Sequence, residues 1–106
     1  MKSTNGAAEL ATAAEHAADF LRTLAHPARL RMVCALLEGE LTAGELALRA
    51  GLRAPALSQQ ATVLEAGGVL QRRRDARSVR YSLASPAVRA QARLLHRLFC
   101  NNASRR

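Results

Sequence analysis

The sequence predicts a mainly α-helical chain with a β-hairpin wing, in the order α-α-α-α-β-β-α, which is a winged helix-turn-helix. Three observations predict this fold class. Two short helical patterns meet at "AGL", residues 50–52, as they do in a helix-turn-helix. The alternating stretches "VLQRRR" and "SVRYSL" flank "DAR", a pattern typical of a hairpin. Apolar residues recur at helical spacing near both ends of the chain.

The first two helices are defined by an apolar stripe and by a proline. A helix is expected over residues 7–24, and Pro27 suits the first turn of a second helix that runs to about Glu38 and ends at Gly39. The first helix carries its apolar residues on one side, at Leu10, Ala14, Ala17, Ala18, Leu21 and Leu24.

The helix-turn-helix is expected over residues 42–66. Thr42 and Glu45 have the spacing of a capping box, so a helix begins there, and Gly51 ends it. The second helix has Pro55 in its first turn and ends at a pair of glycines. Its inward stripe is predicted to consist of Leu57, Ala61 and Leu64.

The wing is expected over residues 69–83 and the last helix over residues 86–102. Ser85 and Pro86 provide the start signals of that helix. Its apolar face carries Val88, Ala92, Leu95 and Phe99. With 106 residues the sequence has room for one domain, so residues 1–106 are predicted to form a single winged helix-turn-helix domain.

The net charge of +8 is concentrated in the last third of the chain. Residues 1–70 carry six basic and seven acidic side chains, whereas residues 71–106 carry ten arginines and one acid, Asp75. A local positive field of this kind favours nucleic acid as the partner over an ordinary solvated face. Membrane attachment is not expected, because no stretch reaches the roughly 18 apolar residues of a spanning helix. The N-terminal stretch is a poor secretory signal, so we expect a cytoplasmic protein.

The second helix of the helix-turn-helix carries the side chains that we expect to contact DNA. Short polar groups that donate and accept hydrogen bonds suit base edges in the major groove, while an arginine suits phosphate and an alanine the thymine methyl group. Gln60 lies near the inward stripe, so an ordinary packing role is almost as well supported for it. The candidates are Arg53, Ala54, Ala56, Ser58, Gln59, Gln60 and Thr62.

The hairpin sequence "RRRDARSVR" places five arginines within nine residues. Arginine suits phosphate forks and narrow minor grooves. We expect Arg74, Arg77 and Arg80 to make such contacts, which position a protein on DNA without reading its sequence. Arg72 and Arg73 point to opposite faces of a strand, so at least one of them is expected to be structural.

Four stretches together resemble the ArsR/SmtB family of small bacterial repressors: "LRTLAHPARLRMV", "GELTAGELALRAGL", "ALSQQATVLEAGGVL" and "RRRDARSVRYSL". The resemblance implies a homodimer whose interface uses the first and last helices, residues 7–24 and 86–102. It also implies repression that an effector relieves. A two-fold symmetric dimer implies a palindromic operator in double-stranded DNA. Arg53 and Ala61 depart from the family, which usually has a small capping residue and a leucine at these two positions.

The sequences around the two cysteines, Cys34 and Cys100, resemble those of one subgroup of this family. The stretches "MVCALLEGE" and "LFC" resemble the BigR/SqrR type, which responds to reactive sulfur species. The resemblance implies that Cys34 and Cys100 form a dithiol switch, which a disulfide or polysulfide bridge within one protomer closes to release DNA. Metal sensors of the family hold their ligands on the first helix of the helix-turn-helix or on the last helix. Here the first of these positions reads "ELTAGEL", without a cysteine, and the last helix offers only His96, so no metal and no cofactor are expected.

Other interpretations of the two cysteines remain open. A response to general oxidants or to a metal would use the same fold. A thiol oxidoreductase would need an activating base and usually a Cys-x-x-Cys motif, and neither is evident, so no enzyme is expected. A winged helix used for protein contacts would leave the arginine wing unexplained. Two core cysteines acting as small apolar side chains are the plainest alternative.

Overall fold

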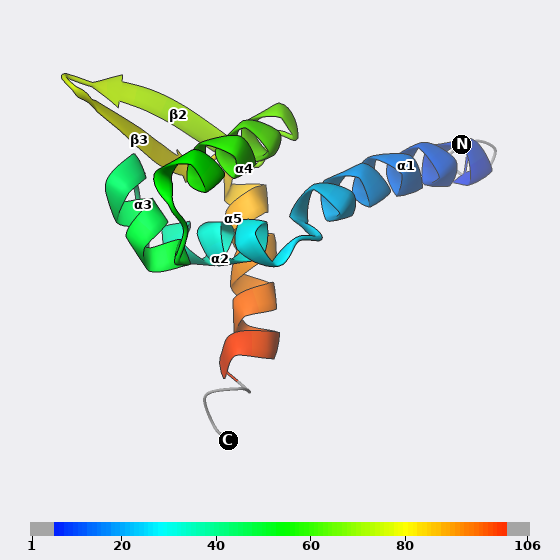
Figure 1. Ribbon diagram of the computed structural model, residues 1–106. Coiled ribbons are helices and arrows are strands. Elements are labelled where there is room, and N and C mark those ends of the chain that lie inside the picture. The colour runs from blue at the N-terminus through cyan, green and yellow to red at the C-terminus, as the bar shows by residue number, and fades with distance from the viewer. Residues whose placement is uncertain (1–5, 102–106) are drawn as a thin grey trace.

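The computed structural model describes residues 6–101, and the side chains up to residue 99 (Figure 1). The predicted order of helices and hairpin is confirmed, with three short elements added: a 3₁₀ turn, a first strand and a π-helical end. The elements are α1 (Gly6–Leu24), α2 (Pro27–Ala35), a 3₁₀ turn (Leu36–Glu38), β1 (Leu41–Thr42), α3 (Ala43–Ala50), α4 (Ala54–Ala66), β2 (Leu70–Asp75), β3 (Ser78–Leu83), α5 (Pro86–Leu95) and a π-helical segment (His96–Asn101).

The three strands form an antiparallel sheet in the order β1-β3-β2. Leu70 lies opposite Leu83 at the base of the hairpin, and Asp75 lies opposite Ser78 at its tip. Strand β1 pairs with β3 through Leu41 and Thr42, and the sequence did not predict it because two residues are too short to show an alternating pattern. The turn between the long strands consists of Ala76 and Arg77, so Asp75 belongs to the strand and not to the expected "DAR" turn.

The core lies where α2, α3 and α4 pack against the base of the hairpin. Met32, Leu36, Leu46, Leu64 and Val69 are fully buried there. The predicted inward stripe of α4 is confirmed, since all three of its members, Leu57, Ala61 and Leu64, are buried. This packing fixes which face of α4 remains in solvent.

Local signals set the helix ends largely as predicted. Thr42 and Glu45 form the capping box of α3, and Gly51 ends that helix in the left-handed conformation, with φ of 69°. Ser85 accepts a hydrogen bond from the Val88 backbone at the start of α5. His26 Nδ1 accepts from the Ala28 backbone, an unpredicted cap that begins α2.

The apolar faces of the first and last helices are covered much less than predicted. Of the α1 side chains, Leu24 alone is buried, whereas Leu10 and Leu21 are 70% and 58% exposed. Phe99 was expected on the packed face of the last helix but is 69% exposed. The reason is visible in Figure 1: both helices extend past the body of the chain, so within residues 6–101 nothing packs against their outer turns.

The last helix also differs in its hydrogen bonding from the expected helix over 86–102. Regular α-helix ends at Leu95 and a π-helical segment continues to Asn101. Residue 102 lies outside the described residues. In the described part of the chain, no helix combines the length and the apolar character that crossing a membrane requires.

Candidate DNA-binding surface and thiol site

The solvent face of α4 carries the polar side chains that the sequence predicted there. Ser58, Gln59 and Thr62 are exposed on the side opposite the buried stripe. Thr62 donates its hydroxyl to the Ser58 carbonyl oxygen at 3.0 Å, which orients it along the helix. A helix that presents short donors and acceptors on an exposed face has the chemistry needed to read base edges.

The beginning of α4 carries three further candidates. Arg53 is the exposed N-cap residue, and its side chain makes no capping hydrogen bond. Ala54 is exposed and Ala56 is half-buried. Arg53 therefore stands at the positive end of the α4 dipole, where backbone N–H groups and a guanidinium together favour an anion such as phosphate.

Gln60 does not join this surface. It is half-buried, and its Oε1 accepts a hydrogen bond from Arg29 Nη1 at 2.8 Å. The expectation that Gln60 contacts the DNA stays a prediction, and it is weakened because the amide oxygen is held toward α2. The alternative of a packing role describes this residue better.

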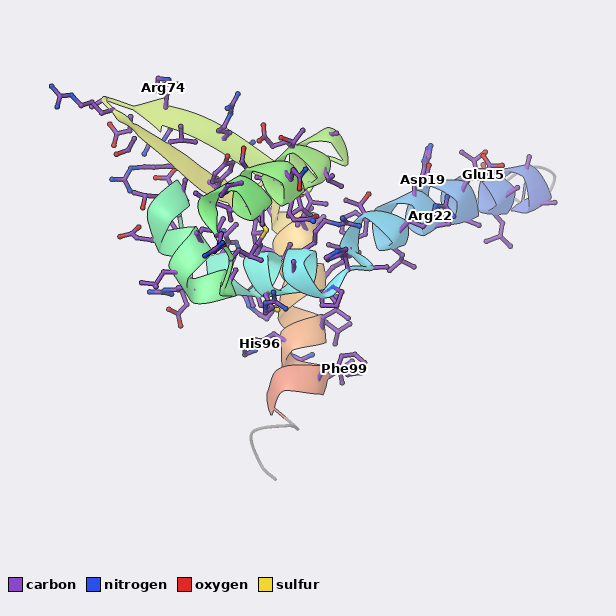
Figure 2. The ribbon with its side chains drawn as sticks, viewed as in Figure 1. Glu15, Asp19, Arg22, Arg74, His96 and Phe99 are labelled. Atoms are coloured by element: carbon purple, nitrogen blue, oxygen red, sulfur yellow. The ribbon has the colours of Figure 1, made fainter. Side chains whose placement is uncertain are left out.

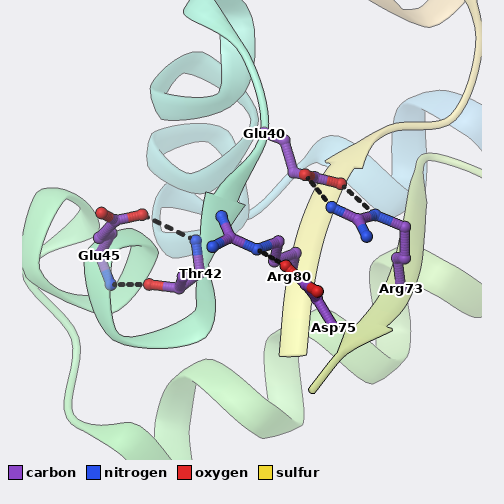
Figure 3. A network of polar contacts seen from close by, with 6 residues as sticks. All are labelled: Glu40, Thr42, Glu45, Arg73, Asp75 and Arg80. Carbon is purple, nitrogen blue, oxygen red and sulfur yellow. Dashed lines mark hydrogen bonds and ion pairs between the residues drawn. The ribbon is translucent and has the colours of Figure 1, made fainter. Parts of the chain in front are cut away.

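The wing arginines divide according to the face of the hairpin on which they lie. Arg73 donates to Glu40 from Nε at 3.0 Å and from Nη2 at 2.7 Å, so the two side chains form a two-point ion pair (Figure 3). This contact lowers the pKa of Glu40 below its usual value and raises the pKa of Arg73. Opposite Arg73 in the sheet, Arg80 donates to Asp75 at 3.0 Å. One face of the wing is thus neutralised by acids.

The expected phosphate contact of Arg80 stays a prediction, and Arg80 is a weaker candidate than Arg74 or Arg77, because its Nε donates to Asp75 and its side chain is less exposed than theirs. On the other face, which is the face toward α4, Arg72 makes a longer ion pair of 3.7 Å with Glu65. Within residues 6–99 no acid pairs with Arg74 or Arg77. Arg74 projects from the outer part of the wing (Figure 2), and both side chains are exposed.

Cys34 is half-buried on α2 and lines an open hollow of about 400 Å³. The other lining residues are Leu30, Arg31, Ala35, Arg49 and His96. Arg31 donates from Nε to the Ala50 carbonyl oxygen at 2.7 Å, so its guanidinium is fixed at the end of α3. The hollow is thus lined from α2, α3 and the last helix, and two arginines and a histidine are among the residues that share it with Cys34.

The second cysteine is located only along the chain. Cys100 belongs to the π-helical segment that follows α5, and its side chain lies outside the described residues. The predicted pairing of Cys34 with Cys100 thus stays a prediction. Among the described residues, no group of three His, Cys, Asp or Glu side chains is placed to hold a metal ion.

Comparison with known proteins identifies the family. A family model described as "Bacterial regulatory protein, arsR family" matches residues 26–71, which run from the cap of α2 to the start of the wing. The biofilm growth-associated repressor of Agrobacterium fabrum is 41% identical over 87 residues, covering 82% of this chain and 74% of that protein. The chain belongs to the ArsR family.

Solved structures similar to this ArsR-family chain have the same architecture. Reduced HlyU from Vibrio cholerae superimposes with a TM-score of 0.82 at 39% identity, covering 87% of this chain and 97% of that one. The transcriptional repressor BigR from Xylella fastidiosa gives 0.79 at 37% identity, covering 87% and 94%. The expected fold class and the resemblance to the BigR type are therefore confirmed. The chain is a DNA-binding transcriptional regulator of the ArsR/BigR type.

The relatives of this ArsR-family chain are regulators and not enzymes, which removes the thiol oxidoreductase as an interpretation. Three residues of its site were missed by sequence reasoning: Arg29, Arg49 and His96 as a lining residue. Arg29 contacts Gln60, which lies 31 residues away in sequence, and Arg49 and His96 line the hollow from elements distant in sequence from α2. No local pattern signals such a contact.

Proposed function

We propose that this regulator is a homodimeric repressor that binds a palindromic operator and releases it when reactive sulfur species link Cys34 to Cys100. The observation that carries the proposal is the position of Cys34 in a basic hollow between α2, α3 and the helix that bears Cys100. Similarity to the BigR repressors supports the direction of regulation. The resemblance of "MVCALLEGE" and "LFC" to the BigR/SqrR type supports the thiol pair.

DNA recognition is assigned to α4 and one face of the wing. Ser58, Gln59 and Thr62 would contact base edges, and Ala54 and Ala56 would meet a thymine methyl group. Arg53, Arg74 and Arg77 would contact phosphate or the minor groove, since they are exposed and sit at the helix start and the wing. Gln60 and Arg80 are given a smaller part, because Gln60 Oε1 and Arg80 Nε already bond within the chain.

Dimerisation is assigned to α1 and the last helix. The exposed apolar side chains of these helices are Leu10, Leu21, Leu94, Leu98 and Phe99, with between 45% and 70% of each exposed. Each large apolar side chain that becomes fully buried is worth roughly 1.5–3 kcal/mol. A second copy of the chain would cover this surface and place the two α4 helices symmetrically on DNA.

The switch chemistry balances without an added oxidant. A Cys34 thiolate attacks the terminal sulfur of a persulfide RSSH, the carrier leaves as the thiol RSH after proton transfer, and Cys34 becomes a persulfide. A Cys100 thiolate then attacks the Cys34 sulfur and expels HS⁻, which leaves a disulfide. If both cysteines are persulfidated first, their condensation releases H₂S and leaves a trisulfide. The sulfane sulfur of the donor is reduced while the two cysteines are oxidised.

A bridge of either kind would tie α2 to the end of the last helix. Because α5 packs against α2 and the last helix belongs to the proposed dimer surface, this tie would alter the spacing of the two α4 helices. Loss of operator affinity follows from a mismatch between this spacing and the half-sites.

The test begins with selection of a binding sequence from a randomised duplex pool. Operator binding is then followed by fluorescence anisotropy with and without polysulfide, for the wild type and for Cys34→Ser and Cys100→Ser. We expect polysulfide to release DNA from the wild type alone. Release from either single variant, or a bridge between two protomers found by mass spectrometry, would disprove the intramolecular switch. Equal release by peroxide would replace sulfur sensing with a general oxidant response.

A further inference from the structure

The hollow at Cys34 has a consistent electrostatic character. Its wall is mainly apolar, and the basic residues that line it are Arg31, Arg49 and His96, beside Leu30 and Ala35. No carboxylate is among these lining residues. The nearest described acid contact is the ion pair of Arg49 with Glu38, whose atoms are 3.8 Å apart and whose carboxylate side chain is 87% exposed. Such an open pair neutralises little of the charge.

The two guanidinium groups are held differently. Arg31 is fixed by its bond to the Ala50 carbonyl oxygen, which uses one N–H and leaves its other donors for a ligand. Arg49 lies on the last turn of α3 and half of its side chain is exposed. One cation is thus preorganised and the other is adaptable, an arrangement that suits an anion larger than a single atom.

From this arrangement we infer that the hollow recruits anionic sulfur donors, and that the preferred donor for Cys34 is a persulfide whose carrier thiol bears carboxylate groups. This inference rests on the proposed function, because it names the class of donor for the same thiol. The carboxylates contact Arg31 and Arg49, while the apolar floor faces the carbon chain of the carrier.

The charge also addresses a difficulty in the reaction itself. A thiolate that attacks an anionic donor meets like-charge repulsion, which slows the approach of the two sulfur atoms. Cations that line the approach offset the repulsion, and they stabilise the second negative charge as the carrier leaves as a thiolate. A donor of equal intrinsic reactivity but positive charge is disfavoured at both stages.

The experiment uses the full-length Cys100→Ser protein, in which Cys34 is the only remaining thiol. Its rate of modification is measured with two methanethiosulfonates of the same mechanism, one carrying a sulfonate and the other a trimethylammonium group. The ratio of the two rates is divided by the ratio for a small neutral thiol. Mass spectrometry of quenched samples gives the extent of reaction.

We expect the normalised ratio to favour the sulfonate reagent about tenfold at low salt and to approach one near 0.5 M salt. Arg49→Gln should reduce the preference and Arg49→Glu should reduce it further. Arg22→Gln is the matched control, because it removes the same charge from the exposed surface of α1. Arg49 is chosen over Arg31 because its loss breaks only an exposed ion pair.

A ratio near one in the parent protein, or an equal ratio in Arg49→Glu, would overturn the inference. These outcomes are independent of the DNA-release assay. If the protein selects donors by charge but sulfur treatment does not release DNA, the hollow is a donor site and the proposed switch is wrong. If sulfur treatment releases DNA but the rates show no charge selection, the proposed switch stands and the hollow is not a donor site.

Discussion

Arg29 connects three helices, and its removal provides a sharp test of how the DNA-binding helix is held. Its Nε donates to the carbonyl oxygen of Thr23 in the last turn of α1 at 2.5 Å, and its Nη1 donates to Gln60 of α4 at 2.8 Å. Arg29 itself belongs to α2 and is half-buried. A single guanidinium therefore fixes the start of α2 to both its neighbours.

The expected magnitude follows from these two bonds. Hydrogen bonds with a charged partner contribute roughly 1.5–3 kcal/mol each, and partial exposure favours the lower end. Arg29→Ala should therefore lower the free energy of unfolding by about 2–4 kcal/mol. Gln60→Ala removes one of the two bonds and should cost about 1–2 kcal/mol. Arg29→Lys should behave like Arg29→Ala, because an ammonium group lacks the planar fork that reaches two acceptors.

The assay is urea unfolding of the wild type, the three single variants and the Arg29→Ala, Gln60→Ala double variant. Because Arg29 and Gln60 share one bond, their effects should be less than additive, with a coupling of about 1 kcal/mol or more. A coupling below about 0.3 kcal/mol would refute the connection. A different result would also refute it: Gln60→Ala keeps its stability and its affinity for random duplex but loses affinity for the selected operator. Gln60 would then be a residue that reads bases.

Three further predictions concern the same surface and its supports. Gly67→Ala should destabilise the fold by about 1–3 kcal/mol, because an added Cβ would lie 2.6 Å from Thr23 Cγ2, and Thr23→Ala should relieve the loss in thermal unfolding. Arg74→Ala should weaken binding to all duplexes and lower the slope of log affinity against log salt concentration by about 1. Gln59→Ala should cost roughly 1–3 kcal/mol of binding free energy on the selected operator alone. An equal loss on random duplex would show that Gln59 does not read bases. The pKa of Glu40 is lowered, so its ion pair contributes fully to stability above the ordinary glutamate pKa, and that contribution is lost as the pH falls through the lowered value. Glu40→Gln should therefore flatten the acid side of a plot of unfolding free energy against pH. An unchanged plot would contradict this.

The parts of the fold that were predictable from sequence are those set by neighbouring residues. The capping box of Thr42 and Glu45, the left-handed Gly51 and the buried stripe of α4 all depend on spacings of a few residues, and the structure contains each of them. The two residues of β1 gave no such signal, because their pairing partners in β3 lie about 40 residues away.

The candidate site was predictable as a class of surface but not residue by residue. Composition indicated an arginine wing, yet the division of its arginines depends on Glu40, which lies 33 residues before Arg73. Similarly, helical spacing placed Gln60 near the edge of the buried stripe without revealing Arg29 as its partner. Phe99 had the spacing of a packed residue, but spacing does not tell where the body of the chain ends.

The contacts at the base of α1 bear on how a change at the thiol would reach DNA. Thr23 of α1 abuts Gly67 at the end of α4, and Arg29 joins the same turn of α1 to Gln60 in the middle of α4. Both connections from α1 to α4 start at Thr23, so a movement of the last turn of α1 at a dimer interface would act on α4 directly. Cys34 and Arg29 lie on one short helix, α2. A bridge that pulls on α2 at Cys34 would therefore act on α4 through Arg29 as well as through the interface. This predicts that Arg29→Ala weakens the coupling between sulfur treatment and DNA release more than it weakens DNA binding itself.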